Sequence, residues 1–232
     1  MHRIPCARSL PPHRACLVPV AVGLALVLTA PGVLAQCQTN QNCWPPLGVT
    51  CAYPAPGPIF YPGSPGPFGI RNGLLHDPSA CAPMPPQGGV PINSFFDIFV
   101  ELDLSTNGGT NWTPHSLSPR PSGVRILPPV PVGPDLVFST EMLQLDLSGG
   151  SLPAGVMIRE SPTLQSTGQI RQRDLGGGQY SVDSFFDIFT ELSFDGGQSW
   201  FPSNQPLHTT TIERSPTPSR ASTWGTVKVL YR

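Results

Sequence analysis

The sequence has little charge, almost no lysine and, beyond its N-terminus, no long hydrophobic run. Charged residues make up 12% of the 232 residues, and Lys228 is the only lysine. Proteins that bind nucleic acid or an anionic membrane surface carry a basic patch, so both partner classes are excluded. A membrane-spanning helix needs about 20 consecutive apolar residues, and no such run follows residue 35. We therefore expect no membrane span in the chain after that residue.

The sequence also lacks the motifs of common catalytic and metal sites. It has no Gly-x-Ser-x-Gly elbow, no His-Glu-x-x-His motif and no calcium-binding loop. His76, His115 and His208 occur in loop or strand-edge contexts without such a signature. We therefore expect no catalytic residue, no metal site and no cofactor.

Residues 1–35 have the three parts of a secretory signal peptide. Three arginines with no acidic residue precede an almost wholly apolar stretch over 15–30, and small residues end the segment at Ala35. We expect cleavage after Ala35 and a secreted, periplasmic or cell-surface protein. The alternative, a lipoprotein signal before Cys37, requires a small residue where Gln36 stands. Removing the three arginines takes the 13 basic residues to 10 against 14 acidic ones, a formal net charge of −4.

Proline and glycine are abundant and unevenly placed. The sequence has 31 prolines and 24 glycines, just below the fraction of about 25–30% that is typical of low-complexity disorder. They are concentrated between clusters of Phe, Ile, Val and Leu. This pattern predicts short β-strands joined by loops, with little helix.

Residues 36–90 form a proline-rich segment that contains four cysteines. An even number of cysteines in an exported chain predicts two disulfides. Three connectivities are open, and the pairing of Cys37 with Cys43 and of Cys51 with Cys81 is the least entangled. A zinc site is disfavoured because the gaps between the cysteines exceed the usual two-to-four-residue spacing. The proline runs at 54–58 and 62–67 are interpreted as extended spacers, with a proline-rich ligand for a partner's groove as the alternative.

One nine-residue phrase occurs twice, over 94–102 and 184–192, with eight identical positions. Its apolar residues alternate with polar ones, which predicts a strand with one core face. A helix is the rival interpretation, because Ser94 and Asp97 resemble a capping box, but the Gly-Gly turn that follows each copy favours a hairpin. The predicted core positions are Phe96, Ile98, Val100, Leu102 and Leu104, and in the second copy Phe186, Ile188, Thr190, Leu192 and Phe194.

After each phrase, eight residues resemble the Asp box of sialidase-type repeats, Ser-x-Asp-x-Gly-x-Thr-Trp. The second copy, 193–200, matches more closely than the first, 105–112, which has Asn107 for the aspartate and Asn111 for the threonine. The resemblance implies a hairpin turn held by the aspartate, with the tryptophan packed beneath it, in a structural and non-catalytic role. The wider pattern also resembles uncharacterised exported bacterial proteins with the same Phe-Phe-Asp phrase, which implies no activity. The Asp-box positions are Ser105, Asn107, Gly109 and Trp112, and Ser193, Asp195, Gly197 and Trp200.

The remaining periodic stretches complete an all-β prediction. Strands are expected over 136–147, 155–159, 169–175, 179–183, 208–213 and 226–231, whereas the proline-rich stretch 115–134 is interpreted as a linker or crossing loop. The predicted fold is a β-sandwich-like duplicated module with a Pro/Cys-rich N-terminal segment. The expected parts are a signal peptide (1–35), a disulfide-stapled segment (36–90), a first β repeat (91–130) and a second (131–232).

The repeated carboxylates do not have the spacing of a glycosidase pair. Asp97 and Glu101 lie four residues apart on one strand face, about 13 Å at roughly 3.3 Å per residue, whereas glycosidases need about 5–9.5 Å. Asp97 could meet Asp187 only if the two repeats packed face to face, so a structural role is preferred.

The sequence therefore favours an exported, non-enzymatic structural or binding protein of the cell surface or extracellular space. The alternative is a carbohydrate-binding module or glycan-processing enzyme, with a glycan rather than a cell-surface protein as partner. Such a module leaves an aromatic row exposed on one sheet face, whereas a scaffold buries its rings. The candidate stacking residues are Trp112, Trp200, Phe99 and Phe189.

Overall fold

The computed structural model describes residues 37–48, 51–63, 66 and 68–213. The predicted signal peptide and the strand expected over 226–231 lie outside the described residues. Within those residues the all-β prediction is confirmed, and the only helical element is a 3-10 turn, η1 (Gln87–Gly89). The strands are β1 (Cys37–Thr39), β2 (Cys43–Trp44), β3 (Cys51–Ala55), β4 (Ile59–Phe60), β5 (Gly69–His76), β6 (Ala82–Pro83), β7 (Ile92–Ser105), β8 (Thr113–Ile126), β9 (Val130–Val132), β10 (Asp135–Ser148), β11 (Met157–Glu160), β12 (Thr167–Gly176), β13 (Gln179–Ile188), β14 (Thr190–Ser193), β15 (Phe201–Pro202), β16 (Leu207–Thr210) and β17 (Ile212–Glu213).

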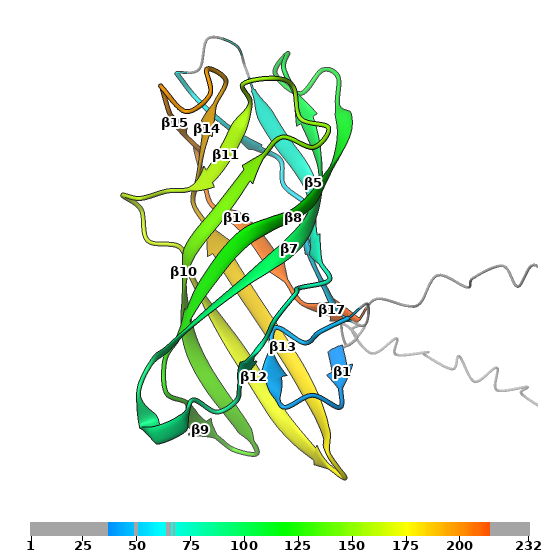
Figure 1. The fold of residues 1–232 in the computed structure, drawn as a ribbon, viewed down its shortest axis with the longest axis vertical. Helices are drawn as coiled ribbons and strands as arrows, with labels where there is room; N and C mark the ends of the chain where they lie inside the picture. Colours follow the sequence, from blue (N-terminus) through cyan, green and yellow to red (C-terminus); the bar gives the residue numbers. More distant parts are fainter. Residues whose placement is uncertain (1–36, 49–50, 64–65, 67, 214–232) are drawn as a thin grey trace, which may run out of the picture. The chain divides into compact units, whose positions relative to one another are not determined.

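The long strands form one antiparallel sheet that is nearly closed on itself (Figure 1). Its order is β13-β12-β10-β8-β7-β5-β3-β17, and β16, which precedes β17 in the chain, pairs with β13. The segment that holds β16 and β17 therefore joins the two ends of the sheet. Between these strands, the Thr211 N–H donates to the Ser184 carbonyl at 2.7 Å. Where a sandwich has two packed layers, this single sheet curves around one core.

The repeated phrase forms the strands that the alternation predicts. In β7 the exposed fractions of Phe96, Ile98 and Val100 are 7%, 3% and 3%, whereas that of the outward-facing Phe95 is 59%. In the second copy β13 ends at Ile188 and β14 begins at Thr190, because the chain leaves the β12 side of the sheet and pairs with β11 and β15. The inner face is buried in both copies, except that Phe194 is only half-buried against the core.

The stretch interpreted as a linker over 115–134 is instead largely a strand, so that interpretation was wrong. β8 pairs with β7 along almost its whole length and with β10 on its other side. The linker interpretation rested on the prolines, but Pro119 falls where the register with β7 shifts and pairing is interrupted. Leu117, Val124 and Ile126 of β8 are buried in the core, and this burial outweighs the loss of ladder hydrogen bonds.

The N-terminal segment is part of the core. All four predicted cysteines form disulfides, but the pairs are Cys37 with Cys51 and Cys43 with Cys81, with Cα separations of 5.7 and 5.5 Å. The pairs interleave because β1 lies beside β13, whereas β2 pairs with β6 in a separate two-stranded sheet.

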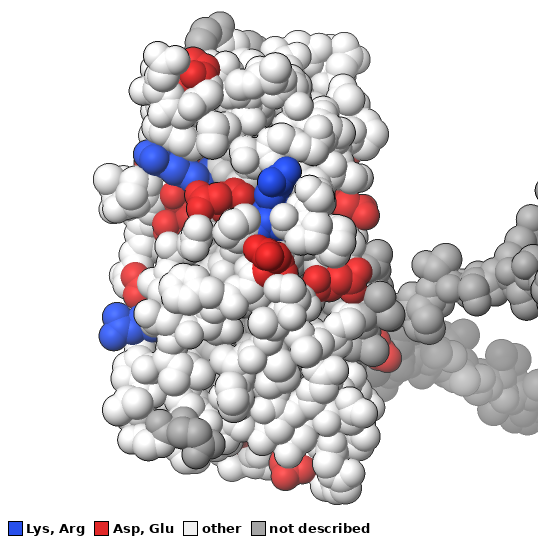
Figure 2. Space-filling model, viewed as in Figure 1, with Lys and Arg blue, Asp and Glu red and all other residues white. Residues whose placement is uncertain are grey.

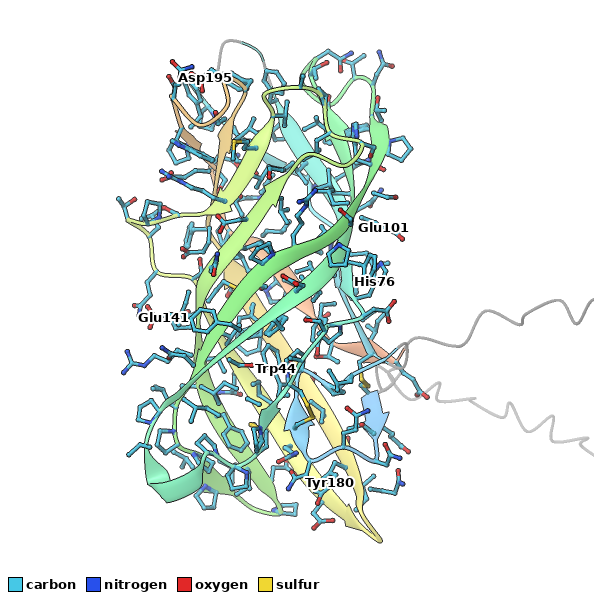
Figure 3. All side chains as sticks on the ribbon, viewed as in Figure 1. Trp44, His76, Glu101, Glu141, Tyr180 and Asp195 are labelled. Carbon is cyan, nitrogen blue, oxygen red and sulfur yellow. A yellow bond between two sulfur atoms is a disulfide. The ribbon has the colours of Figure 1, made fainter. Side chains whose placement is uncertain are left out.

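The proline run at 54–58 was also misjudged as a spacer, because β3, which includes Pro54, pairs with both β5 and β17 in the main sheet. Next to the second disulfide, Trp44 is 3% exposed and lies inside the closed sheet (Figure 3). Its ring contacts Tyr53, Phe96 and Phe186 at centroid distances of 6.1, 6.1 and 5.5 Å. Phe96 and Phe186 occupy the same position of the two phrases, so the segment packs against both copies at once.

Candidate functional site

The two predicted Asp-box turns, 105–112 and 193–200, share a set of hydrogen bonds made by their serine and by the residue two positions later. In the second turn the Ser193 hydroxyl donates to Asp195 Oδ1 at 2.8 Å and accepts from the Gly197 N–H at 2.9 Å. The same carboxylate oxygen accepts the N–H groups of Gln198 and Ser199, both at 2.9 Å. These donors hold the pKa of Asp195 at about 2, the Ser199 N–H being the main cause and the Ser193 hydroxyl the next. Figure 3 labels Asp195 at one end of the sheet.

In the first turn the side-chain amide oxygen of Asn107 accepts hydrogen bonds in the place of the Asp195 carboxylate. Ser105 donates to Asn107 Oδ1 at 3.0 Å and accepts from the Gly109 N–H at 2.9 Å, and Asn107 Oδ1 accepts the Asn111 N–H at 2.8 Å. Gly109 has a φ of +83° that an L side chain rarely adopts, and a Cβ there would lie 3.2 Å from the Trp112 ring. The departures of the first copy from the motif therefore leave its turn geometry intact.

Each turn tryptophan is covered by an arginine that is itself held by a carboxylate. The Arg71 guanidinium lies 4.5 Å from the Trp112 ring centroid and that of Arg159 lies 3.9 Å from Trp200. Arg71 bonds Asp103 at 3.1 Å, and Arg159 bonds Glu191 at 2.7 Å. One face of each predicted stacking tryptophan is thus already occupied by a guanidinium.

These contacts repeat with a constant offset. Arg71 pairs across the strands with Asp103, and Arg159 pairs with Glu191 in the same way. Each residue of the second pair lies 88 positions after its counterpart, which is also the offset between the two tryptophans. The offset extends to the neighbouring strand pairs, which are Ile59 with Ile70 and Ile70 with Leu104 in the first set, and Leu147 with Ile158 and Ile158 with Leu192 in the second.

The four rings predicted to stack on a sugar do not form one row. Phe99 on β7 is 38% exposed and stacks on His76 at 5.6 Å, whereas Phe189 lies between β13 and β14. The strands β8, β10 and β12 separate β7 from β13 in the sheet. The two tryptophans lie in the turns at strand ends. The aromatic row that these four residues were expected to make is therefore absent from the described sheet.

The carboxylates of the phrase also stay apart. Asp187 bonds His208 at 2.7 Å, Glu101 lies 3.5 Å from His76, and Glu191 bonds Arg159. Figure 3 shows His76 and Glu101 side by side. Asp97 and Asp187 lie on strands separated by three others, so they do not meet. Within the ranges that the structure describes, no three metal-ligating side chains lie close enough together to hold a metal ion.

The carboxyl of Glu160, outside the phrase, has a raised pKa. Glu160 ends β11 and accepts a hydrogen bond from the Ser166 hydroxyl at 3.0 Å. Burial raises the pKa of Glu160, the Ser166 bond partly offsets this, and the nearby charges of Glu141 and Glu191 raise it further.

A groove of about 530 Å³ lies on the outer surface of the sheet, where sequence reasoning placed no site. Its walls come from β8, β10, β12 and the stretch before β12. Because β8 was interpreted as a linker and the lining residues are far apart in the sequence, no local motif marked them. The lining side chains include Arg125, Leu127, Ser139, Glu141, Gln165 and Thr167.

Charged side chains on the face shown in Figure 2 gather in a band across the middle, and much of the surface on either side carries none. No helix among the described residues has the length and apolar character to cross a membrane. Comparison of the chain with protein-family models, with curated proteins and with solved structures finds no match to any of them.

Proposed function

We propose that the chain is an exported, non-enzymatic binding protein of the cell surface or extracellular space. The observation that carries this proposal is the pair of interleaved disulfides, because structural disulfides persist in oxidising compartments outside the cytoplasm. They tie a segment that holds Trp44 to the core of the sheet. The predicted signal peptide over 1–35 agrees with the same destination.

The repeated residues support a binding protein rather than an enzyme. A catalytic acid or base must reach the substrate, but Asp195, Glu191 and Asp187 are each held in local contacts with the protein itself. The tryptophans of the turns are covered by arginines. The carboxylates, arginines and tryptophans stabilise the nearly closed sheet, and the outer surface of that sheet is then available to a partner.

Export and oxidation are tested in one experiment. The full chain and a chain beginning at Gln36 are expressed in a bacterium, the cells are fractionated, and free thiols are titrated in denaturant. We expect the full chain outside the cytoplasm, shortened after Ala35 and without free thiols at the four described cysteines. The chain without residues 1–35 should stay in the cytoplasm with reduced thiols. Full-length protein retained in the cytoplasm with all six of its cysteines as free thiols would contradict the proposal.

A glycan-processing enzyme is the second candidate, and the raised pKa of Glu160 near Glu141 favours it. Glycosidases combine a protonated carboxyl with an ionised one. The test is release of reducing ends from polysaccharides by the wild-type protein and by Glu160→Gln. Hydrolysis that is lost in Glu160→Gln would replace the non-enzymatic proposal, whereas no release by folded wild-type protein would reject the enzyme.

A further inference from the structure

The groove over β8, β10 and β12 brings together polar side chains from three strands. Arg125 of β8 pairs across the sheet with Glu141 of β10, and Glu141 pairs with Thr167 of β12. The three side chains therefore form one outward-facing row across the groove, with Ser139 one step away on the same face of β10. Figure 3 labels Glu141 on the outer side of β10. The volume of about 530 Å³ lies within the range of about 300–1,000 Å³ that ligand sites occupy.

The charged groups of the groove are available to a ligand. Arg125 is exposed, and it forms no ion pair or hydrogen bond with any residue that the structure describes. This distinguishes it from Arg71, Arg159 and Arg173, which are held by carboxylates. Glu141 accepts a bond from the Gln165 amide at 3.0 Å, which leaves its second oxygen as an acceptor. The groove thus offers a ligand the Arg125 guanidinium as a hydrogen-bond donor and the Glu141 carboxylate as an acceptor, and their opposite charges cancel.

An aromatic ring borders this polar row. Phe95 is 59% exposed, whereas the other exposed rings among the described residues, Phe99 and Phe185, are 38% and 37% exposed. Its ring lies over Gly123 of β8, where a Cβ would come within 2.6 Å of it. Gly123 is two positions from Arg125 on the same face, so their Cα atoms lie about 7 Å apart and the Phe95 ring borders the Arg125 position. A side chain at position 123 would collide with this ring, so the glycine leaves the space that the ring occupies.

We propose that this groove binds a neutral oligosaccharide, a proposal that rests on the proposed binding function. Sugar rings present hydroxyls that both donate and accept, and apolar faces that stack on aromatic rings. The sugar hydroxyls would form hydrogen bonds with Arg125, Glu141, Ser139 and Thr167, and the apolar face would stack on the Phe95 ring. The balance of one cation and one anion suits an uncharged ligand, whereas a nucleic acid requires several cations. A peptide that adds a strand requires a free sheet edge, and β8, β10 and β12 are each paired on both sides.

The experiment measures binding of defined sugars to the mature protein by titration calorimetry. The neutral probes are cellohexaose, xylohexaose, mannohexaose and chitohexaose, and the acidic probe is hexagalacturonate. We expect one or more neutral probes to bind. Arg125→Gln should weaken that binding by roughly tenfold or more, because hydrogen bonds to charged groups are among the stronger polar contacts. Phe95→Ala should weaken it by about fivefold through loss of the aromatic contact.

Matched controls lie on the same outer surface. Phe99→Ala removes another exposed ring of β7, and Arg171→Gln removes an exposed guanidinium of β12. Both should bind the sugar within about twofold of wild type, and the melting temperature of every variant shows that it is folded. Unchanged affinity in Arg125→Gln and Phe95→Ala, binding of hexagalacturonate alone, or no binding of any neutral probe would each overturn the proposal. None of these results bears on export or on thiol oxidation, so the failure of the groove is distinguishable from the failure of the proposed function.

Discussion

Trp44 offers the sharpest test of how the N-terminal segment stabilises the sheet. Its ring is 3% exposed and contacts three other rings. Truncation of a buried tryptophan to alanine costs about 3–5 kcal/mol. For a chain of this size, 1 kcal/mol shifts the melting temperature by about 2–4 °C. Trp44→Ala should therefore lower the melting temperature by roughly 10 °C.

A second substitution at the same position separates packing from hydrogen bonding. The Trp44 indole N–H is buried and has no hydrogen-bond partner among the described residues. An unpaired buried donor costs about 1–3 kcal/mol, so Trp44→Phe loses part of the ring but also removes that cost. We expect Trp44→Phe to stay within about 1 kcal/mol of wild type. The exposed Phe95 is the control, and Phe95→Ala should cost about 1 kcal/mol at most.

Urea and thermal unfolding of the oxidised protein, followed by near-ultraviolet circular dichroism, measure these effects. The reasoning would be refuted if Trp44→Ala shifted the melting temperature by less than about 2 °C, because the segment would then lie outside the cooperative core. It would also be refuted if Trp44→Phe were as costly as Trp44→Ala, since the N–H would then have a partner.

Three further predictions concern the disulfides, the turns and the arginine clusters. The double variant Cys43→Ser/Cys81→Ser opens a loop of sequence separation 38 and should lose about 4 kcal/mol of unfolding free energy in urea titrations; a loss below about 1 kcal/mol would contradict the expectation. The folded pKa of Asp195 is lowered from 3.8 to about 2, so its contribution is present above about pH 4 and is lost as the pH falls towards 2. Asp195→Asn places the residue of the first turn, Asn107, in the second turn and should leave that turn folded. The melting temperature of this variant should fall less than that of wild type as the pH is lowered from about 4 to about 2. The same pH dependence in both proteins would show that the Asp195 carboxylate does not stabilise the fold. Trp200→Ala should lower the melting temperature, because it uncovers Arg159 and the Glu191 side chain, which is 10% exposed. Trp112→Ala should lower it less, because Arg71 and Asp103 are already more exposed. Equal shifts of the melting temperature in the two variants would show that burial of the ion pair does not matter.

The alternation of residues in the repeated phrase was enough to predict its structure. A strand places successive side chains on opposite faces, and Phe96, Ile98 and Val100 are buried while Phe95 is exposed. The first copy has two extra residues before its turn, Asp103 and Leu104. An even number leaves the faces unchanged, so both copies keep their core side.

The features that sequence reasoning missed depend on contacts between distant segments. Proline was treated as a strand breaker, yet β8 and β3 contain prolines and lie within the sheet, because the buried residues around them outweigh the lost hydrogen bonds. The disulfide pairing follows from the positions of β1 and β2 beside other strands, which cysteine spacing does not encode. The groove depends on the register of three strands that pair Arg125 with Glu141 and Glu141 with Thr167.

Closure of the sheet also constrains when the protein can fold. β17 pairs with β3 through Ile212 and Ala52, which are 160 positions apart in the sequence. Contacts of such separation form late and slowly, because a long loop must close before they contribute stability. A chain that emerges in order therefore cannot complete its sheet until residues 207–213 are available. Closure of the sheet therefore waits until nearly the whole described chain, from Cys37 to Glu213, has been synthesised.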